Sequence, residues 1–131
     1  PIQYLKFSMK LDKAVTYSRK NRSTVIKLTG EDGMTQYIVA GEITYVESVN
    51  HYVYFHTSHG VYKKLMSLSK AEQMLEGVGF LRSDVSFLVN PAYVTSLGKD
   101  SLMIGEQKIP ISRNRKKEFM RKFTGYRKYV H

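Results

Sequence analysis

The sequence predicts a mainly β fold with a short internal helix and helical ends. Short segments in which apolar and polar residues alternate recur along most of the chain, with Gly, Asp, Asn and Ser between them, as is typical of antiparallel strands and turns. One internal segment and both ends instead repeat apolar residues at helical spacing. No apolar run approaches the roughly 18 residues that a membrane-spanning helix needs.

The chain begins with a helical pattern and then changes to period two. Tyr4, Phe7 and Leu11 lie on one helical stripe, and the polar segment 17–22 indicates a linker. From residue 23 onward, alternation and turn residues predict a run of short strands. We expect these strands at 25–29, 35–39, 43–47, 51–57, 61–65, 87–90, 93–97, 101–104 and 108–112.

An internal helix is expected after the fifth of these strands. Ser67 is a suitable N-cap, because its hydroxyl can accept a hydrogen bond from the first helical turn. Leu68, Ala71 and Met74 would face inward, and the helix would end near Leu75, before two glycines.

The last element is predicted to be a helix from Arg113 to about residue 123, with Ser112 as its N-cap. Phe119 and Phe123, at positions i and i+4, define its buried side. Its first turn is crowded with cations, which the helix dipole disfavours there by about 0.3–1 kcal/mol per exposed charge. A bound phosphate would reverse the sign of this interaction. The pattern therefore favours anion binding, and an ordinary solvated basic face is the alternative.

Length and composition are those of one globular domain. The chain has 131 residues, 42% of them hydrophobic, and it has no cysteine for a disulfide or thiolate site. The net charge of +10 is segregated: residues 1–22 carry six basic residues and one acid, residues 113–131 carry eight and one, and residues 23–112 carry seven and nine. Such basic ends favour a polyanionic partner.

Five motifs along the chain carry a family resemblance. They are Ile43-Thr44-Tyr45-Val46-Glu47-Ser48, His51-Tyr52, Ser67-Leu68-Ser69-Lys70-Ala71-Glu72, Phe80-Leu81-Arg82-Ser83-Asp84-Val85-Ser86-Phe87-Leu88-Val89-Asn90 and Ile109-Pro110-Ile111-Ser112-Arg113. In this order they resemble the LytTR DNA-binding domain of bacterial response regulators, over residues 23 to 126. The resemblance implies an elongated stack of small antiparallel sheets and double-stranded DNA as the partner.

The resemblance also implies which residues contact DNA. Base contacts would come from His51, Val85 and Arg113, and an arginine can pair with both O6 and N7 of guanine. Backbone or positioning contacts would come from Asn50, Tyr52, Arg82, Ser83, Asp84, Ser86, Ser112, Asn114, Arg115, Lys116 and Lys117. The alternatives are a salt bridge for Arg113 and an unpartnered surface imidazole for His51.

The segment 82–86, which we expect to be a loop, departs from the family pattern. Asp84 stands where the family has histidine, and Val85 stands where it has a polar or basic residue. Valine cannot donate a hydrogen bond but can touch a thymine methyl group, so the base preference of this loop is open. Arg82 fits a phosphate contact, or alternatively a pair with Asp84 that holds the loop. Asn90 is expected to fix a turn.

The sequence gives no pattern for an enzyme, a cofactor or a metal. His51, His56 and His59 are close in sequence, but the first two are expected on opposite faces of one strand. The glycines at 77 and 79 lack the rest of a nucleotide-binding motif. Nothing assembles a nucleophile, base and orienting group.

We therefore expect a sequence-specific DNA-binding domain at 23–131, preceded at 1–22 by a linker and a helix that resembles the last helix of a receiver domain. The resemblance implies the output half of a cytoplasmic two-component regulator. In such a phosphorelay, receiver phosphorylation drives dimerisation on repeated promoter sites and activates transcription, without a membrane or a small-molecule substrate.

Two other classes of function stay open. The basic ends could dock an acidic protein or an anionic membrane surface, and the odd Asp84-Val85 pair supports this interaction-module alternative. Exposed tyrosines could instead bind RNA.

Overall fold

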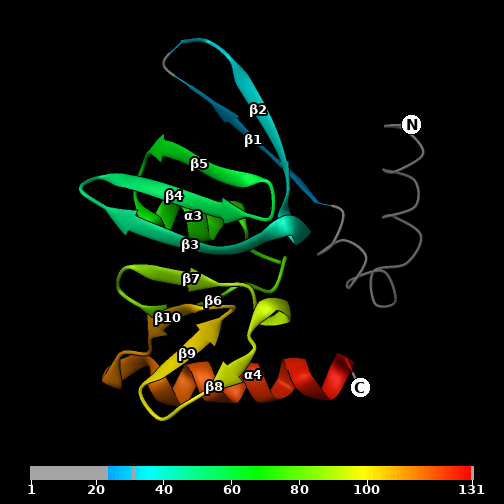
Figure 1. Cartoon of the computed structure of the whole chain (residues 1–131), viewed down its shortest axis with the longest axis vertical. Helices are drawn as coiled ribbons and strands as arrows, with labels where there is room; N and C mark the ends of the chain where they lie inside the picture. Colours follow the sequence, from blue (N-terminus) through cyan, green and yellow to red (C-terminus); the bar gives the residue numbers. More distant parts are fainter. Residues whose placement is uncertain (1–23, 31, 131) are drawn as a thin grey trace.

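Three antiparallel sheets follow one another along the long axis of the computed structural model, which describes residues 24–30 and 32–130, with side chains up to Tyr126 (Figure 1). The hairpin of β1 (Val25–Thr29) and β2 (Thr35–Val39) projects at one end. The helix and linker expected at 1–22 lie outside the described residues.

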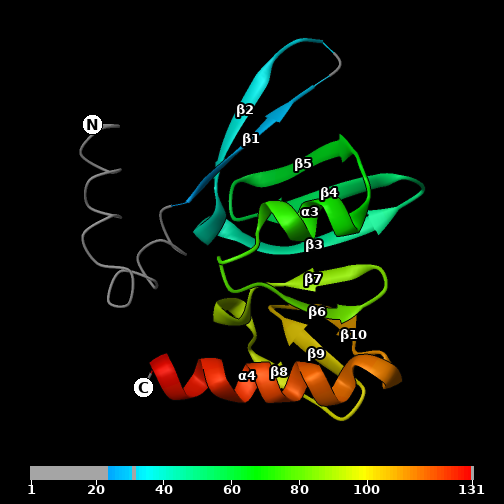
Figure 2. The same ribbon diagram turned by 180° about the vertical axis from the view of Figure 1, so that it is seen from behind.

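The central sheet has five strands in the order β5-β4-β3-β7-β6. Its strands are β3 (Ile43–Val49), β4 (Tyr52–Thr57), β5 (Gly60–Leu65), β6 (Leu81–Asp84) and β7 (Phe87–Val89). Helix α3 (Leu68–Met74) covers the back of this sheet (Figure 2), and Ser67 caps it by accepting a 3.1 Å hydrogen bond from the Lys70 N–H.

The last sheet and the last helix close the other end of the molecule. β8 (Ser96–Leu97), β9 (Ser101–Ile104) and β10 (Gln107–Pro110) form a small sheet in the order β10-β9-β8. A 3-10 turn, η3 (Arg113–Arg115), leads into α4 (Lys116–Val130), which runs beneath this sheet (Figure 1). Two further 3-10 turns are η1 (Ala40–Glu42) and η2 (Pro91–Tyr93).

The stacked shape follows from strands whose two faces are both buried. Successive residues of a strand point to opposite faces, so Val46 joins a cluster with α3, while its neighbour Tyr45 joins a second cluster with α4. Leu88 and Val89 divide in the same way on β7. The central sheet therefore lies between two hydrophobic cores, and the mainly β, stacked fold predicted from the sequence is confirmed.

Most expected elements are present, but the expectation of a loop at 82–86 is wrong. Residues Leu81–Asp84 form β6, and only 85 and 86 lie in the turn. The period-two pattern was hidden because the second inward position is Ser83, a polar residue that is nevertheless fully buried. A polar residue at an inward position removes the alternation on which strand prediction depends.

Several other boundaries also differ from expectation. The strand expected at 93–97 is reduced to two residues, because Pro91 and the Asn90 cap set up η2 first. Asn90 fixes this turn as predicted: its Oδ1 accepts from the Ala92 N–H at 3.1 Å and its Nδ2 donates to the Ile43 carbonyl at 2.9 Å. The last helix extends beyond residue 123 to Val130. Within the described residues, no helix has the length and apolarity needed to cross a membrane.

Candidate nucleic-acid interface

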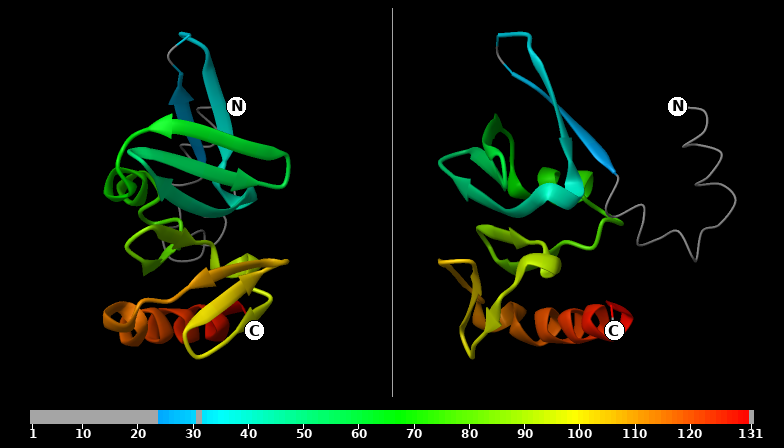
Figure 3. Two further views of the ribbon diagram at one scale, coloured as in Figure 1. Left: turned by 60° about the vertical axis from the view of Figure 1, so that its left-hand side comes forward. Right: turned by 45° about the vertical axis from the view of Figure 1, so that its right-hand side comes forward.

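Three segments that are far apart in sequence meet at one edge of the molecule. They are the β3–β4 turn (residues 50–51), the β6–β7 turn (85–86) and the start of the last helix (112–117), and we call them together the tip edge (Figures 1 to 3). Backbone hydrogen bonds join them. Ser48 N–H donates to the Ser86 carbonyl at 2.9 Å, and Ser112 N–H donates to the Ser83 carbonyl at 2.8 Å. The two turns and the helix start therefore form one continuous surface.

The β3–β4 turn exposes His51 on an unusual backbone. Val49 pairs with Tyr52, so Asn50 and His51 form a two-residue hairpin turn, with φ angles of 50° and 72°. Positive φ at both central positions is the type I′ geometry, which matches the twist of the flanking strands. The His51 carbonyl accepts a 3.2 Å hydrogen bond from the Met66 N–H, while its side chain is exposed. His51 was expected in the strand, but it lies before β4.

The β6–β7 turn is held by Arg82 rather than left free. The guanidinium donates from Nε to the Asp84 carbonyl at 2.9 Å and from Nη2 to the Val85 carbonyl at 2.9 Å. Its Nη1 lies 2.6 Å from Glu72 Oε1 on α3, and only 13% of the Arg82 side chain is exposed. Arg82 therefore holds the turn, which was the alternative to a phosphate contact. Its acidic partner is Glu72, however, and not Asp84 as that alternative assumed. The guanidinium is therefore engaged within the protein and is not available for a phosphate.

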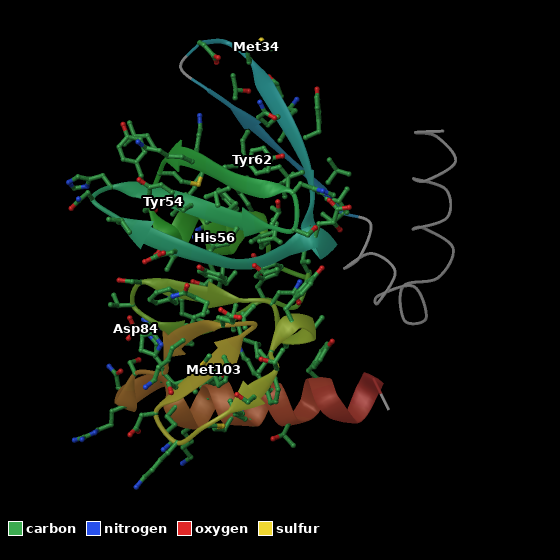
Figure 4. The ribbon with its side chains drawn as sticks, viewed as in Figure 1. Met34, Tyr54, His56, Tyr62, Asp84 and Met103 are labelled. Atoms are coloured by element: carbon green, nitrogen blue, oxygen red, sulfur yellow. The ribbon has the colours of Figure 1, made fainter. Side chains whose placement is uncertain are left out.

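Two other residues of this segment also have internal roles. Ser83 was expected to position DNA, but it is fully buried, and its hydroxyl has no hydrogen-bond partner within the described residues. It therefore cannot reach a phosphate. Asp84, labelled in Figure 4, accepts a 3.2 Å hydrogen bond from the Ser86 N–H through Oδ2, which closes the turn. Val85 projects between them with 66% of its surface exposed.

The start of the last helix is attached to β6. The predicted N-cap role of Ser112 is wrong, because its hydroxyl makes no cap and instead lies 3.4 Å from the Ser83 carbonyl. This attachment fixes Arg113, which is exposed and makes no ion pair within the described residues. Within the described residues, Arg113 therefore does not form the salt bridge that was the alternative to a base contact.

The remaining cations of this segment differ in their surroundings. Lys117 is exposed, whereas Lys116 Nζ lies 3.8 Å from Asp100 Oδ1. Asn114 and Arg115 line a shallow groove between α4 and β6 that also includes Glu72. Because α4 runs away from the tip edge (Figure 1), only its first turn contributes charge there.

Tyr52 also has a partner within the protein. Lys63 Nζ lies 4.3 Å from the centre of its ring, a cation–π contact across the β4–β5 pair. Tyr52 was expected as a backbone or positioning contact, but it is half-buried and its ring is engaged by Lys63. Tyr54, two residues further along β4, lies on the same face of the sheet because successive strand residues alternate between faces.

His56 is partly buried and lies near the end of β4 that is remote from the tip edge. Its ring stacks on Tyr45 with centroids 4.1 Å apart, and its Nε2 lies 3.7 Å from Glu47 Oε1, too far for a hydrogen bond. Burial lowers the pKa of His56, and the negative charge of Glu47 opposes that effect. Burial likewise raises the pKa of Tyr45. Within the described residues, no group of three His, Cys, Asp or Glu side chains is arranged to hold a metal.

Sequence reasoning missed two residues that shape this surface. Glu72, which anchors Arg82, lies ten residues away on α3, and no local pattern links the two. Val49 is 40% exposed at the end of β3, where we expected the strand to have ended. The consecutive polar residues Glu47 and Ser48 interrupt the alternation before Val49, so no local pattern extended the expected strand to that residue.

Comparison with known proteins agrees with this geometry. The family model of the LytTr DNA-binding domain matches residues 33–124. Among solved structures, the chain is similar to the LytTr DNA-binding domain of a putative methyl-accepting/DNA response regulator from Bacillus cereus. The two are 21% identical with a TM-score of 0.65, and the match covers 75% of this chain and 94% of that chain. Identity this low shows a shared fold.

No curated protein matches the chain. The matching family model nevertheless spans well over half of the sequence and includes all three segments of the tip edge. That family is one of DNA-binding, not catalytic, domains. The chain belongs to the LytTR family of DNA-binding domains.

Proposed function

We propose that this chain binds double-stranded DNA sequence-specifically as the output domain of a two-component transcriptional regulator. The observation that carries the proposal is the meeting of His51, Val85 and Arg113 segments at the tip edge. Each segment presents an exposed side chain. Because the three lie on one side of the molecule, a single duplex could contact all of them.

Arg113 is the strongest candidate for direct base contact. Its side chain is exposed, it has no ion pair within the described residues, and its backbone is held against β6 through Ser112. A guanidinium that is fixed at its base and free at its end can donate two hydrogen bonds to guanine O6 and N7. His51 supports it from the β3–β4 turn, since an imidazole can donate or accept at a base edge.

The first turn of the last helix provides groups for phosphate contact. The backbone N–H groups of Arg113 and Asn114 have no acceptor within the described residues, and Lys117 is exposed nearby. Free N–H groups at a helix start and adjacent cations together suit an anion. Asn50, Ser86, Arg115 and Lys116 complete the set of candidate positioning residues.

We infer the following biological setting from the family. Residues 23–131 form the DNA-binding domain, and 1–22 derive from the end of a receiver domain and a linker. Two copies bind repeated promoter sites in the cytoplasm, and phosphorylation of the receiver promotes this pairing. The proposal needs no cofactor, membrane or small-molecule substrate.

Substitution of Arg113 tests this function. A target would first be selected from randomised duplexes at a stated salt concentration. We expect Arg113→Ala to weaken binding to the selected duplex by about 1–3 kcal/mol and to abolish preference at one base pair. Lys117→Ala should weaken binding to all duplexes alike and reduce the salt slope by about one.

Arg121→Ala is the matched control, because Arg121 is an exposed arginine on the same helix that already pairs with Glu118 at 2.8 Å. It should leave base preference unchanged. An Arg113→Ala protein with the original preference would refute the base-contact role. Equal binding to a polyacidic peptide and to every duplex would instead favour the interaction-module alternative.

A further inference from the structure

We propose that the β6–β7 turn recognises the C5-methyl group of a thymine in the major groove, through the apolar side chain of Val85. The inference rests on the proposed DNA-binding function and specifies what one part of the site recognises. It concerns a position at which a hydrogen-bonding residue would be expected from the family resemblance.

The backbone carbonyls of this turn and the Ser86 N–H are paired inside the protein. Arg82 donates to the carbonyls of Asp84 and Val85, both at 2.9 Å. The Ser86 N–H donates to Asp84 Oδ2 at 3.2 Å, and the Ser86 carbonyl accepts from the Ser48 N–H at 2.9 Å. Breaking any of these bonds to contact a base would cost free energy, because the lost partner must be replaced. The backbone of the turn is therefore poorly suited to hydrogen-bonded recognition of a base, and the Val85 side chain has no group that could make such a bond.

The side chain that does project from the turn is apolar. Val85 is 66% exposed, and Val49, at the end of β3, is 40% exposed. The β3–β7 ladder pairs Glu47 with Phe87, and the next bond runs from the Ser48 N–H to the Ser86 carbonyl, so Val49 and Val85 are the next two residues in this register. Together the two exposed valines would give the tip edge a small apolar step beside the turn that carries His51 and the segment that carries Arg113.

Among the groups that base pairs expose in the major groove, the thymine methyl group is the one that matches an apolar surface. In the major groove, thymine alone among the four bases carries a methyl group, and apolar side chains contact it. The anchored Arg82 also holds Val85 in place before binding, so little side-chain or loop entropy would be lost on contact.

The test uses deoxyuridine, which lacks only the methyl group of thymine. In the duplex selected from the random library, each thymine would be replaced singly by deoxyuridine. Binding to the whole 131-residue chain would be measured at fixed salt. We expect one such replacement to weaken binding about fourfold, the ratio that corresponds to about 0.8 kcal/mol for one buried methyl or methylene group. In Val85→Ala, the same replacement should have little effect.

Val61→Ala is the matched control, because Val61 is a comparably exposed valine, at 54%, on β5 and away from the tip edge. It should keep the full response to deoxyuridine. A second variant, Val85→Asn, restores a polar residue and should also lose that response. The double-mutant comparison isolates the contact between the side chain and the methyl group from general effects of either change.

The outcomes separate this inference from the proposed function. If no duplex is preferred over others, the proposed function fails. If a duplex is preferred and Arg113→Ala abolishes the preference, but no deoxyuridine replacement depends on Val85, this inference alone is overturned. Equal weakening of all duplexes by Val85→Ala would overturn it as well.

Discussion

The two turns of the tip edge expose their contact residues in opposite ways. The β3–β4 turn places Asn50 and His51 at positive φ and leaves both side chains exposed. The β6–β7 turn has no residue at positive φ. The Arg82 guanidinium instead donates hydrogen bonds to the Asp84 and Val85 carbonyls and to Glu72 on α3. One turn therefore depends on an unfavourable backbone conformation, and the other depends on the largely buried Arg82 side chain.

The two turns therefore differ in what fixes their exposed residues: a local backbone conformation in one, and a side chain bonded to a distant element in the other. Positive φ is uncommon for residues other than glycine, and Asn50 and His51 are the two such residues in the described part of the chain. A side chain that persists in such a conformation suggests that function, rather than stability, selects it. Val85 needs no such strain, because its position is set by Arg82 and Glu72 from a distance. Stability and binding should consequently respond differently to changes in the two turns.

The largest effect on stability is expected from Arg82→Ala. The change removes three hydrogen bonds from a guanidinium that is only 13% exposed and leaves the Asp84 and Val85 carbonyls without their donor. We expect a loss of about 2–3 kcal/mol in the free energy of unfolding, measured by urea denaturation. Arg121→Ala, which removes an exposed ion pair, should change it by less than about 0.5 kcal/mol. Similar losses in both variants would contradict the role of Arg82.

A smaller effect of the opposite sign is expected from His51→Gly. Glycine adopts positive φ without a steric cost, and Asn-Gly is the preferred pair for a type I′ turn. We expect the free energy of unfolding to rise by about 0.5–1 kcal/mol while affinity for the selected duplex falls, because the imidazole is lost. Thermal unfolding and a duplex titration would measure the two quantities.

His51→Ala is the control for this pair of measurements. It also removes the imidazole but keeps a side chain at positive φ, so affinity should fall without the gain in stability. If His51→Gly were stabilised and bound DNA as well as the original chain, His51 would have no part in binding.

The smallest effect is a pH dependence that belongs to the β3–β4 hairpin. Because burial lowers the pKa of His56, the folded state favours the neutral imidazole more than the unfolded state does. This contribution to stability is fully present above the unfolded pKa of about 6.5 and is lost as the pH falls through the lower folded pKa. Urea midpoints at about pH 7.5 and pH 5.5 would measure it.

His56→Phe should remove this pH dependence and keep the stacking on Tyr45. An unchanged pH dependence in that variant would assign the effect to another group. The variant also tests whether the hairpin needs a titratable residue beside Glu47.

Much of the fold could be predicted because its signals are local. The alternation in β4, the Ser67 cap of α3 and the pair Phe119–Phe123, whose rings lie 6.0 Å apart in the structure, all follow from neighbours within a few residues. Strand β6 could not be predicted in this way. Its inward Ser83 resembles a loop residue until β10 and η3 are seen to pack against it.

The candidate site likewise contains residues that could be predicted from the sequence and residues that could not. The sequence and its family resemblance identified His51, Val85 and Arg113 as candidates, and all three are exposed on the tip edge. The functions assigned to Arg82, Ser83 and Ser112 needed revision. Each of these side chains is occupied or buried by a partner from another element, and a single sequence does not contain that information.

By itself, the sequence determined most kinds of element in the described part of the chain and their order, with β6 as the exception, and the excess of positive charge where the last helix begins. These properties depend on backbone preferences and side-chain spacing, which act over a few residues. Only the tertiary structure decided that two turns and a helix start share one edge, and that a glutamate on α3 fixes the turn that presents Val85. Such contacts arise from the packing of strands on both faces of the central sheet, so they depend on the whole chain.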